Sequence, residues 1–158
     1  KPELLFIPGY YTDVANIARQ ARKLGMEMPL LGGDGWDSED LAKNGGEAVE
    51  GAYYSNHYAP DQPSPEIEEF VSKYQTAYGP VPDGLAALGY DAAKILFDAM
   101  GRAKAPTKKD LRDAIAATKE FRCVTGVITI NADRDAVKSA VVVQMKGGKP
   151  VFRAAIAP

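Results

Sequence analysis

The segment from Leu4 to Trp36 constrains the fold most, because two apolar runs flank a stretch with helical spacing. The first run, Leu4–Ile7, is typical of a strand that is buried on both faces, and a proline and a glycine follow it. The second run starts at Met28 and stops at two consecutive glycines. Between them we expect a helix that is capped by Thr12 and ends at Gly25 in the left-handed conformation. Its apolar face consists of Val14, Ile17, Ala18, Ala21 and Leu24.

Two chemically useful side chains directly follow the predicted strands. Tyr10 comes after the first strand and Asp34 after the second. A strand–helix–strand unit builds a parallel sheet, and open sheets of this kind bind ligands at their carboxyl edge. We therefore expect the Tyr10 phenol and the Asp34 carboxylate to lie side by side at that edge. The carboxylate is suited to a metal ion, a proton or an ammonium group, and the alternative is an aspartate that hydrogen-bonds its own turn.

Composition excludes several classes of function. The chain has 158 residues and a net charge of −2, so it lacks the basic surface of a nucleic-acid-binding protein. No apolar run is long enough to span a bilayer. One cysteine, Cys123, and one histidine, His57, exclude a cysteine zinc cluster and a multi-histidine metal site, and we interpret both residues as structural. The sequence has no phosphate-binding loop, nucleophile elbow or zinc-protease motif. We predict no catalytic residue, no metal and no cofactor.

The rest of the chain begins as α/β and then changes character. Glycines and prolines are densest at residues 79–84, which we interpret as a boundary or hinge. No signal peptide is found at Lys1, so we expect that one was removed or that the natural start lies upstream. The other expected elements are a short helix capped by Ser38, a strand over 49–58, a helix from Ser64 to Tyr78, a longer helix from Leu85, a helix capped by Thr107, a strand over 127–130, and a hairpin of 140–145 with 151–152 around Gly147 and Gly148.

Several ordered stretches resemble the periplasmic branched-chain amino-acid-binding proteins of ABC importers. They are FIPGYY at 6–11, IARQARKLG at 17–25, LLGGDGW at 30–36, GEAVEG at 46–51, LGYDAA at 88–93 and VTGVITI at 124–130. The resemblance implies an α/β fold of the type I periplasmic-binding class, with two Rossmann-like lobes, here incomplete. It implies that residues 1–82 are the second half of the C-terminal lobe. Residues 83–138 would return to the N-terminal lobe, and residues 139–158 would make the final crossing back.

The same resemblance implies a binding function and no enzymatic activity. A branched-chain or related amino acid would be held between two lobes by hinge closure. Asp34 would pair with its α-ammonium group and Tyr10 would contact it, while Trp36 and Leu85 would line the side-chain pocket. The implied partners are the amino acid, an ABC transporter permease and the missing N-terminal portion, either in the same chain or as another chain. The implied location is the periplasm, or the outer face of a membrane through a lipid anchor.

Three alternatives stay open. One is a ligand-sensing receptor domain of the same fold, and the second is an engineered or split fragment of such a binder. The third is a small α/β enzyme that uses Asp34. If the other lobe is absent, the helices over 85–118 should expose an apolar face.

Overall fold

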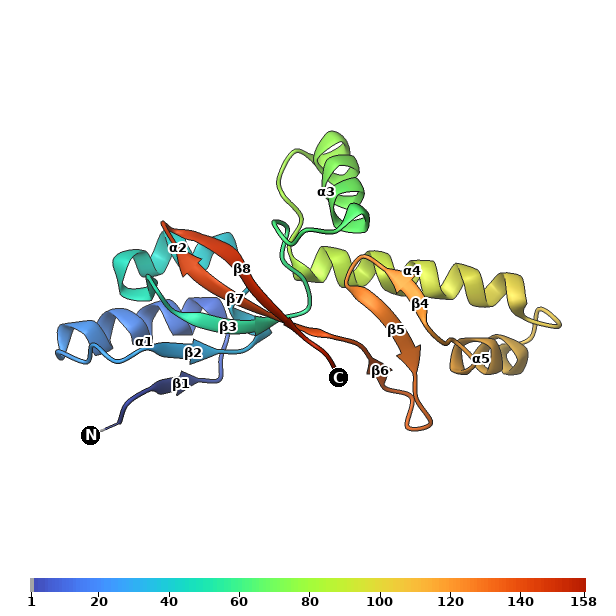
Figure 1. Ribbon diagram of the computed structural model, residues 1–158, viewed down its shortest axis with the longest axis horizontal. Coiled ribbons are helices and arrows are strands. Elements are labelled where there is room, and N and C mark those ends of the chain that lie inside the picture. Colours follow the sequence, from blue (N-terminus) through green and yellow to red (C-terminus); the bar gives the residue numbers. More distant parts are fainter. Residues whose placement is uncertain (1) are drawn as a thin grey trace. The chain divides into compact units, whose positions relative to one another are not determined.

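The computed structural model describes residues 2–158, which form two compact units (Figure 1). The first unit runs to Gln62 and includes Ala140–Ile156. The second unit contains Pro63–Ser139 together with the last two residues. The assignment of residues 1–82, 83–138 and 139–158 to lobes of a larger protein stays a prediction.

The first unit is built on a five-stranded mixed sheet in the order β1-β2-β3-β7-β8. The three strands β1 (Leu5–Ile7), β2 (Leu30–Gly32) and β3 (Tyr53–Asn56) are parallel to one another, as the strand–helix–strand pattern predicts. The remaining two, β7 (Ala140–Lys146) and β8 (Lys149–Ile156), are the predicted hairpin and pair in antiparallel fashion. Their two-residue turn has φ values of 60° at Gly147 and 71° at Gly148, a conformation that glycine adopts without strain.

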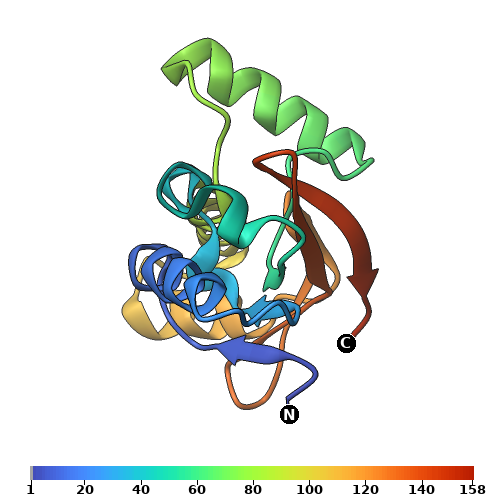
Figure 2. The same cartoon turned by 90° about the vertical axis from the view of Figure 1, so that its left-hand side faces the viewer.

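Helices α1 (Tyr11–Lys23) and α2 (Glu39–Gly45) connect the parallel strands and pack against each other (Figure 2). The predicted cap at Thr12 is wrong: Tyr10 has the extended backbone of an N-cap and makes no side-chain cap, so Thr12 already lies inside the helix. Two other local predictions are confirmed. Gly25 has a φ of 75°, and the Ser38 hydroxyl accepts a hydrogen bond from the Asp40 amide at 3.1 Å.

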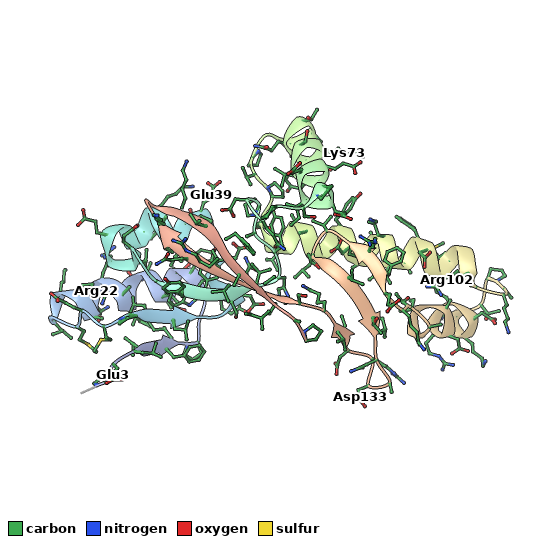
Figure 3. The ribbon with its side chains drawn as sticks, in the orientation of Figure 1. Glu3, Arg22, Glu39, Lys73, Arg102 and Asp133 are labelled. Carbon is green, nitrogen blue, oxygen red and sulfur yellow. The ribbon has the colours of Figure 1, made fainter. Side chains whose placement is uncertain are left out.

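Two short 3-10 turns complete the first unit. The turn η1 (Asp34–Trp36) follows β2, and η2 (Gly46–Val49) follows α2. Because η2 takes up Val49, the strand that we expected over 49–58 is confined to Tyr53–Asn56. Arg22 secures the connection between α1 and β2, since it donates to the carbonyls of Met26 and Met28 at 2.6 and 2.9 Å (Figure 3).

The core of the first unit brings together α1, α2, η1 and the sheet. Its largest fully buried side chains include Trp36, Tyr54, Leu30 and Leu41. These side chains come from two strands, one helix and one turn that pack together, so the unit has a hydrophobic core of its own. The rest of the cluster consists of Ile7, Val14, Ala15, Ala18, Val49, Ala52, Ala59, Val141, Val143 and Met145.

The second unit contains three helices and a small antiparallel sheet. The helices are α3 (Pro65–Tyr78), α4 (Gly84–Arg102) and α5 (Lys108–Ala116). The strands β4 (Phe121–Cys123), β5 (Gly126–Ile130) and β6 (Ala136–Val137) pair in that order. The predicted break over 79–84 separates α3 from α4, whereas β4 and β6 are strands that sequence analysis did not predict.

Helix caps and one buried carboxylate organise the second unit. The Thr107 hydroxyl caps α5, as predicted, by accepting from the Asp110 amide at 3.1 Å. Ser64 precedes α3 but makes no side-chain cap to the backbone, and its hydroxyl donates instead to Glu66 at 2.9 Å. Asp91, only 2% exposed, accepts hydrogen bonds from two backbone amides of the β4–β5 turn, both at 2.8 Å. Arg102 reaches from α4 to the Ala114 carbonyl of α5 at 2.8 Å (Figure 3).

Candidate functional site

The carboxyl ends of the three parallel strands carry three polar side chains. Tyr10 follows β1, Asp34 follows β2 and His57 follows β3. Because these strands are neighbours in the sheet, their carboxyl ends form one continuous edge. Sequence analysis predicted the first two residues at this edge and missed His57. The signal that was available is its position immediately after the third parallel strand.

The turns that follow β1 and β2 are in contact. A Cβ atom at Gly35 would lie 2.9 Å from the Gly9 carbonyl oxygen and 3.2 Å from Cδ1 of Tyr10. Only a glycine fits at this distance without displacing the neighbouring turn. The Tyr10 side chain therefore lies beside the turn that carries Asp34, and Tyr10 is 72% exposed. Contact between the Tyr10 phenol and the Asp34 carboxylate stays a prediction.

Asp34 and His57 form an ion pair or hydrogen bond at this edge. His57 Nε2 lies 3.1 Å from Asp34 Oδ2. The Asp34 side chain is 65% exposed and the His57 side chain 38% exposed, so both are accessible to a small molecule. The Asp34 carboxylate thus contacts His57, and within residues 2–158 it makes no hydrogen bond to the backbone of its own turn.

Trp36 anchors the turn that carries Asp34 to the sheet. Its ring is fully buried, and its Nε1 donates to the Ile7 carbonyl of β1 at 3.2 Å. A Cβ atom at Gly32 would lie 2.0 Å from the Trp36 ring, so the ring occupies the space that a side chain would need. The structure gives Trp36 a packing role, and its contact with a ligand stays a prediction.

Tyr54 supports the same edge from β3. Its buried hydroxyl donates to Asp37 Oδ1 at 3.4 Å. Burial, followed by the negative charge of Asp37, raises the pKa of Tyr54 well above its usual range. The phenol therefore stays protonated and fixes the segment that follows η1 to the end of β3.

Two other residues singled out in the sequence belong to the second unit. Leu85 lies in the first turn of α4 and is 76% exposed, and its role in a ligand pocket stays a prediction. Cys123 is buried, and burial, reinforced by Asp91, raises the pKa of its thiol to about 11. A thiol in this state is protonated at neutral pH, which argues against a nucleophile.

The described residues offer a binding edge and little that favours catalysis. Across residues 2–158, no group of three or more histidine, cysteine, aspartate or glutamate side chains is placed to hold a metal ion. No helix of that part of the chain is long and apolar enough to cross a membrane. The accessible Asp34 carboxylate is suited to a cationic group, because a carboxylate accepts charge-assisted hydrogen bonds.

Comparison with known proteins identifies the family. A model of the periplasmic binding protein family matches residues 1–149. The Leu/Ile/Val-binding protein homolog 1 of Brucella suis is 31% identical over 131 residues, which are 80% of this chain and 34% of that protein. The leucine-binding protein LivK of Thermotoga maritima superposes with a TM-score of 0.93 at 42% identity, over 99% of this chain and 45% of that one. The substrate-binding protein LivJ of Streptococcus pneumoniae, solved with isoleucine, gives 0.84 at 30% identity, over 99% and 44%.

These matches confirm the predicted α/β fold class. They also show that the chain spans about a third of the length of its curated relatives and less than half of the solved structures. All three relatives are named as binding proteins. The chain belongs to the periplasmic binding protein family.

Proposed function

We propose that this chain is part of the solute-binding component of an ABC importer for a branched-chain or related amino acid. The observation that carries the proposal is the accessible Asp34 carboxylate at the carboxyl edge of three parallel strands, on a turn that the Tyr10 ring contacts. The names of the relatives that bind leucine and isoleucine support the same ligand class.

In this proposal Asp34 accepts hydrogen bonds from the α-ammonium group of the ligand, and the Tyr10 phenol contacts the ligand beside it. The Asp34 side chain is 65% exposed in the described residues, and an ion pair at such a site is weak in water. Closure of a second lobe would remove the water and strengthen the charge-assisted bonds. Closure on a ligand without an ammonium group would bury the Asp34 carboxylate without a partner. The cost is on the order of several kcal/mol. The ligand therefore drives hinge closure by its own charge.

The rest of the proposed machinery lies partly outside this chain. Residues 1–82 and 139–158 would belong to the C-terminal lobe, and residues 83–138 to the N-terminal lobe. An N-terminal portion of the same protein would supply the groups that hold the ligand carboxylate. Leu85 would line the side-chain pocket, and Trp36, whose ring is fully buried in this chain, would act there by supporting the turn that carries Asp34. A permease in the membrane would receive the protein with its ligand bound. The protein would lie in the periplasm or be held on the outer face of a membrane by a lipid anchor.

The test is a calorimetric titration of the protein encoded by the full reading frame that contains this chain. The ligands are leucine, isoleucine, valine, phenylalanine and γ-aminobutyrate, together with 4-methylpentanoate, which is leucine without its ammonium group. We expect binding of at least one amino acid and none of 4-methylpentanoate. Asp34→Asn should weaken binding by on the order of a hundredfold, because it leaves the ammonium group without its counter-charge.

Asp40→Asn is the matched control, because Asp40 is an exposed aspartate of α2 whose carboxylate pairs with Lys43 on the same helix. It should bind like the unaltered protein. A folded protein that binds none of the amino acids, or an Asp34→Asn variant that binds them unchanged, would refute the proposal.

A further inference from the structure

We propose that His57 positions the Asp34 carboxylate for the ligand ammonium group and makes ligand binding weaken as the pH falls. This inference rests on the proposed function and adds a residue and a regulation to the same edge.

The position of His57 is fixed by the sheet. It is the first residue after β3, and β3 pairs in parallel with β2 through Tyr54 and Gly32. Its backbone amide donates to the side-chain oxygen of Asn56 at 2.7 Å, and Asn56 is only 5% exposed. The chain therefore leaves the strand in one direction, and the imidazole meets the Asp34 carboxylate at 3.1 Å.

In the neutral state, His57 orients the carboxylate. The tautomer that carries the proton on Nε2 donates to Asp34 Oδ2. Within residues 2–158, the second oxygen, Oδ1, accepts no hydrogen bond. A hydrogen bond to one oxygen restricts rotation of the exposed side chain and keeps the other oxygen for the ammonium group. Such a fixed acceptor lowers the entropic cost of binding.

In the protonated state, His57 competes with the ligand. An imidazolium and an ammonium group would then share the single negative charge of Asp34, and they repel each other. Histidine is the side chain whose charge ordinarily changes between about pH 5 and 8. Acidification through this range should therefore disfavour the complex.

Other ionisable groups at this end of the first unit do not replace His57 in that role. Asp37 accepts from the Tyr54 hydroxyl, and Asp61 accepts from the Phe152 amide at 3.0 Å. Carboxyl groups ordinarily change charge below about pH 5. The Tyr54 phenol stays protonated, because burial and the charge of Asp37 raise its pKa well above the usual range. His57 is also the only histidine of the chain.

The experiment measures the Kd for leucine by calorimetry between pH 5.5 and 8, with the protein encoded by the full reading frame. If only the form with neutral His57 binds, the Kd should rise severalfold from pH 8 to pH 5.5. His57→Ala should weaken binding at pH 8 and abolish the pH dependence. His57→Gln should restore the affinity at pH 8, because its amide also donates to the carboxylate, yet show a flat pH profile.

Thermal unfolding of each variant at both pH values separates a folding defect from a binding defect. The inference would be overturned if the Kd of the unaltered protein did not change with pH, or if His57→Gln kept the full pH dependence. Either result would leave the proposed function intact. Absence of binding to leucine, isoleucine and valine at every pH by the folded, unaltered protein would overturn the proposed function, and the inference with it.

Discussion

The two units of the molecule bury their side chains in different ways. Large aromatic and aliphatic side chains of the first unit, among them Trp36 and Tyr54, are fully buried. In the second unit the largest fully buried side chains are Ile67 and the carboxylate of Asp91. On α4 of that unit, Leu85 and Phe97 are 76% and 67% exposed. The first unit thus buries its largest side chains in one core, whereas the second buries smaller ones and leaves large apolar side chains of α4 exposed.

The largest effect should come from the core of the first unit. We expect Trp36→Ala to lower the free energy of unfolding by about 3–5 kcal/mol, because it leaves a large cavity and removes the hydrogen bond to Ile7. Phe97→Ala is the matched aromatic control in the second unit and should cost less than about 0.5 kcal/mol. Trp36 is the only tryptophan, so urea unfolding should be followed by circular dichroism. Equal losses in the two variants would break the comparison between the units.

The next effect concerns the polar anchor of the second unit. Asp91→Ala removes the acceptor of the two buried amides of Val124 and Thr125 and should cost about 3 kcal/mol. Asp113→Ala removes a carboxylate from an exposed pair with Arg112 and should cost far less than Asp91→Ala, because water screens the pair. The measurement is again urea unfolding, with hydrogen exchange to locate the loss. Exchange that accelerates in the first unit instead of the second would show that the units do not unfold independently.

A smaller effect is expected at the binding edge. Gly35→Ala places a methyl group 2.9 Å from the Gly9 oxygen and should cost about 1–2 kcal/mol, because the two turns must separate. Gly33→Ala is the matched control, since a Cβ atom there meets no atom within 4 Å. Calorimetry should show weaker amino-acid binding for Gly35→Ala only. If Gly33→Ala weakens binding as strongly, the contact between the turns is not what organises the edge.

Sequence reasoning succeeded where the chemistry is local. The caps at Ser38 and Thr107 and the left-handed Gly25 follow from one residue and its near neighbours, and each is observed. The predicted cap at Thr12 failed because Tyr10 has the extended backbone of the N-cap and the helix begins two residues earlier than expected. The strand β4 is only three residues long, so its alternation of apolar and polar side chains is too short to predict a strand by itself.

The candidate site was predictable only in part, because only some of its features depend on residues that are close in sequence. Tyr10 and Asp34 follow strands that the apolar runs identify, and their proximity follows from parallel pairing. The role of His57 depends on which strand neighbours β2, and that information lies in the register between segments distant in sequence. The burial of Trp36 depends on the space above Gly32, which becomes visible only when both strands are in place.

The last prediction tests whether the apolar surface of α4 is what distinguishes the second unit. The double variant Leu85→Ser with Phe97→Ser should change the stability of this chain by less than about 0.5 kcal/mol, since both side chains are largely exposed. It should nevertheless reduce self-association in sedimentation velocity, because exposed apolar patches associate in water. Leu24→Ser is the matched control, an equally exposed leucine at the end of α1 in the first unit, and should leave association unchanged. Self-association that persists in the double variant, or that disappears in the control, would show that another surface mediates the association. The exposed apolar residues of α4 would then not distinguish the second unit from the first.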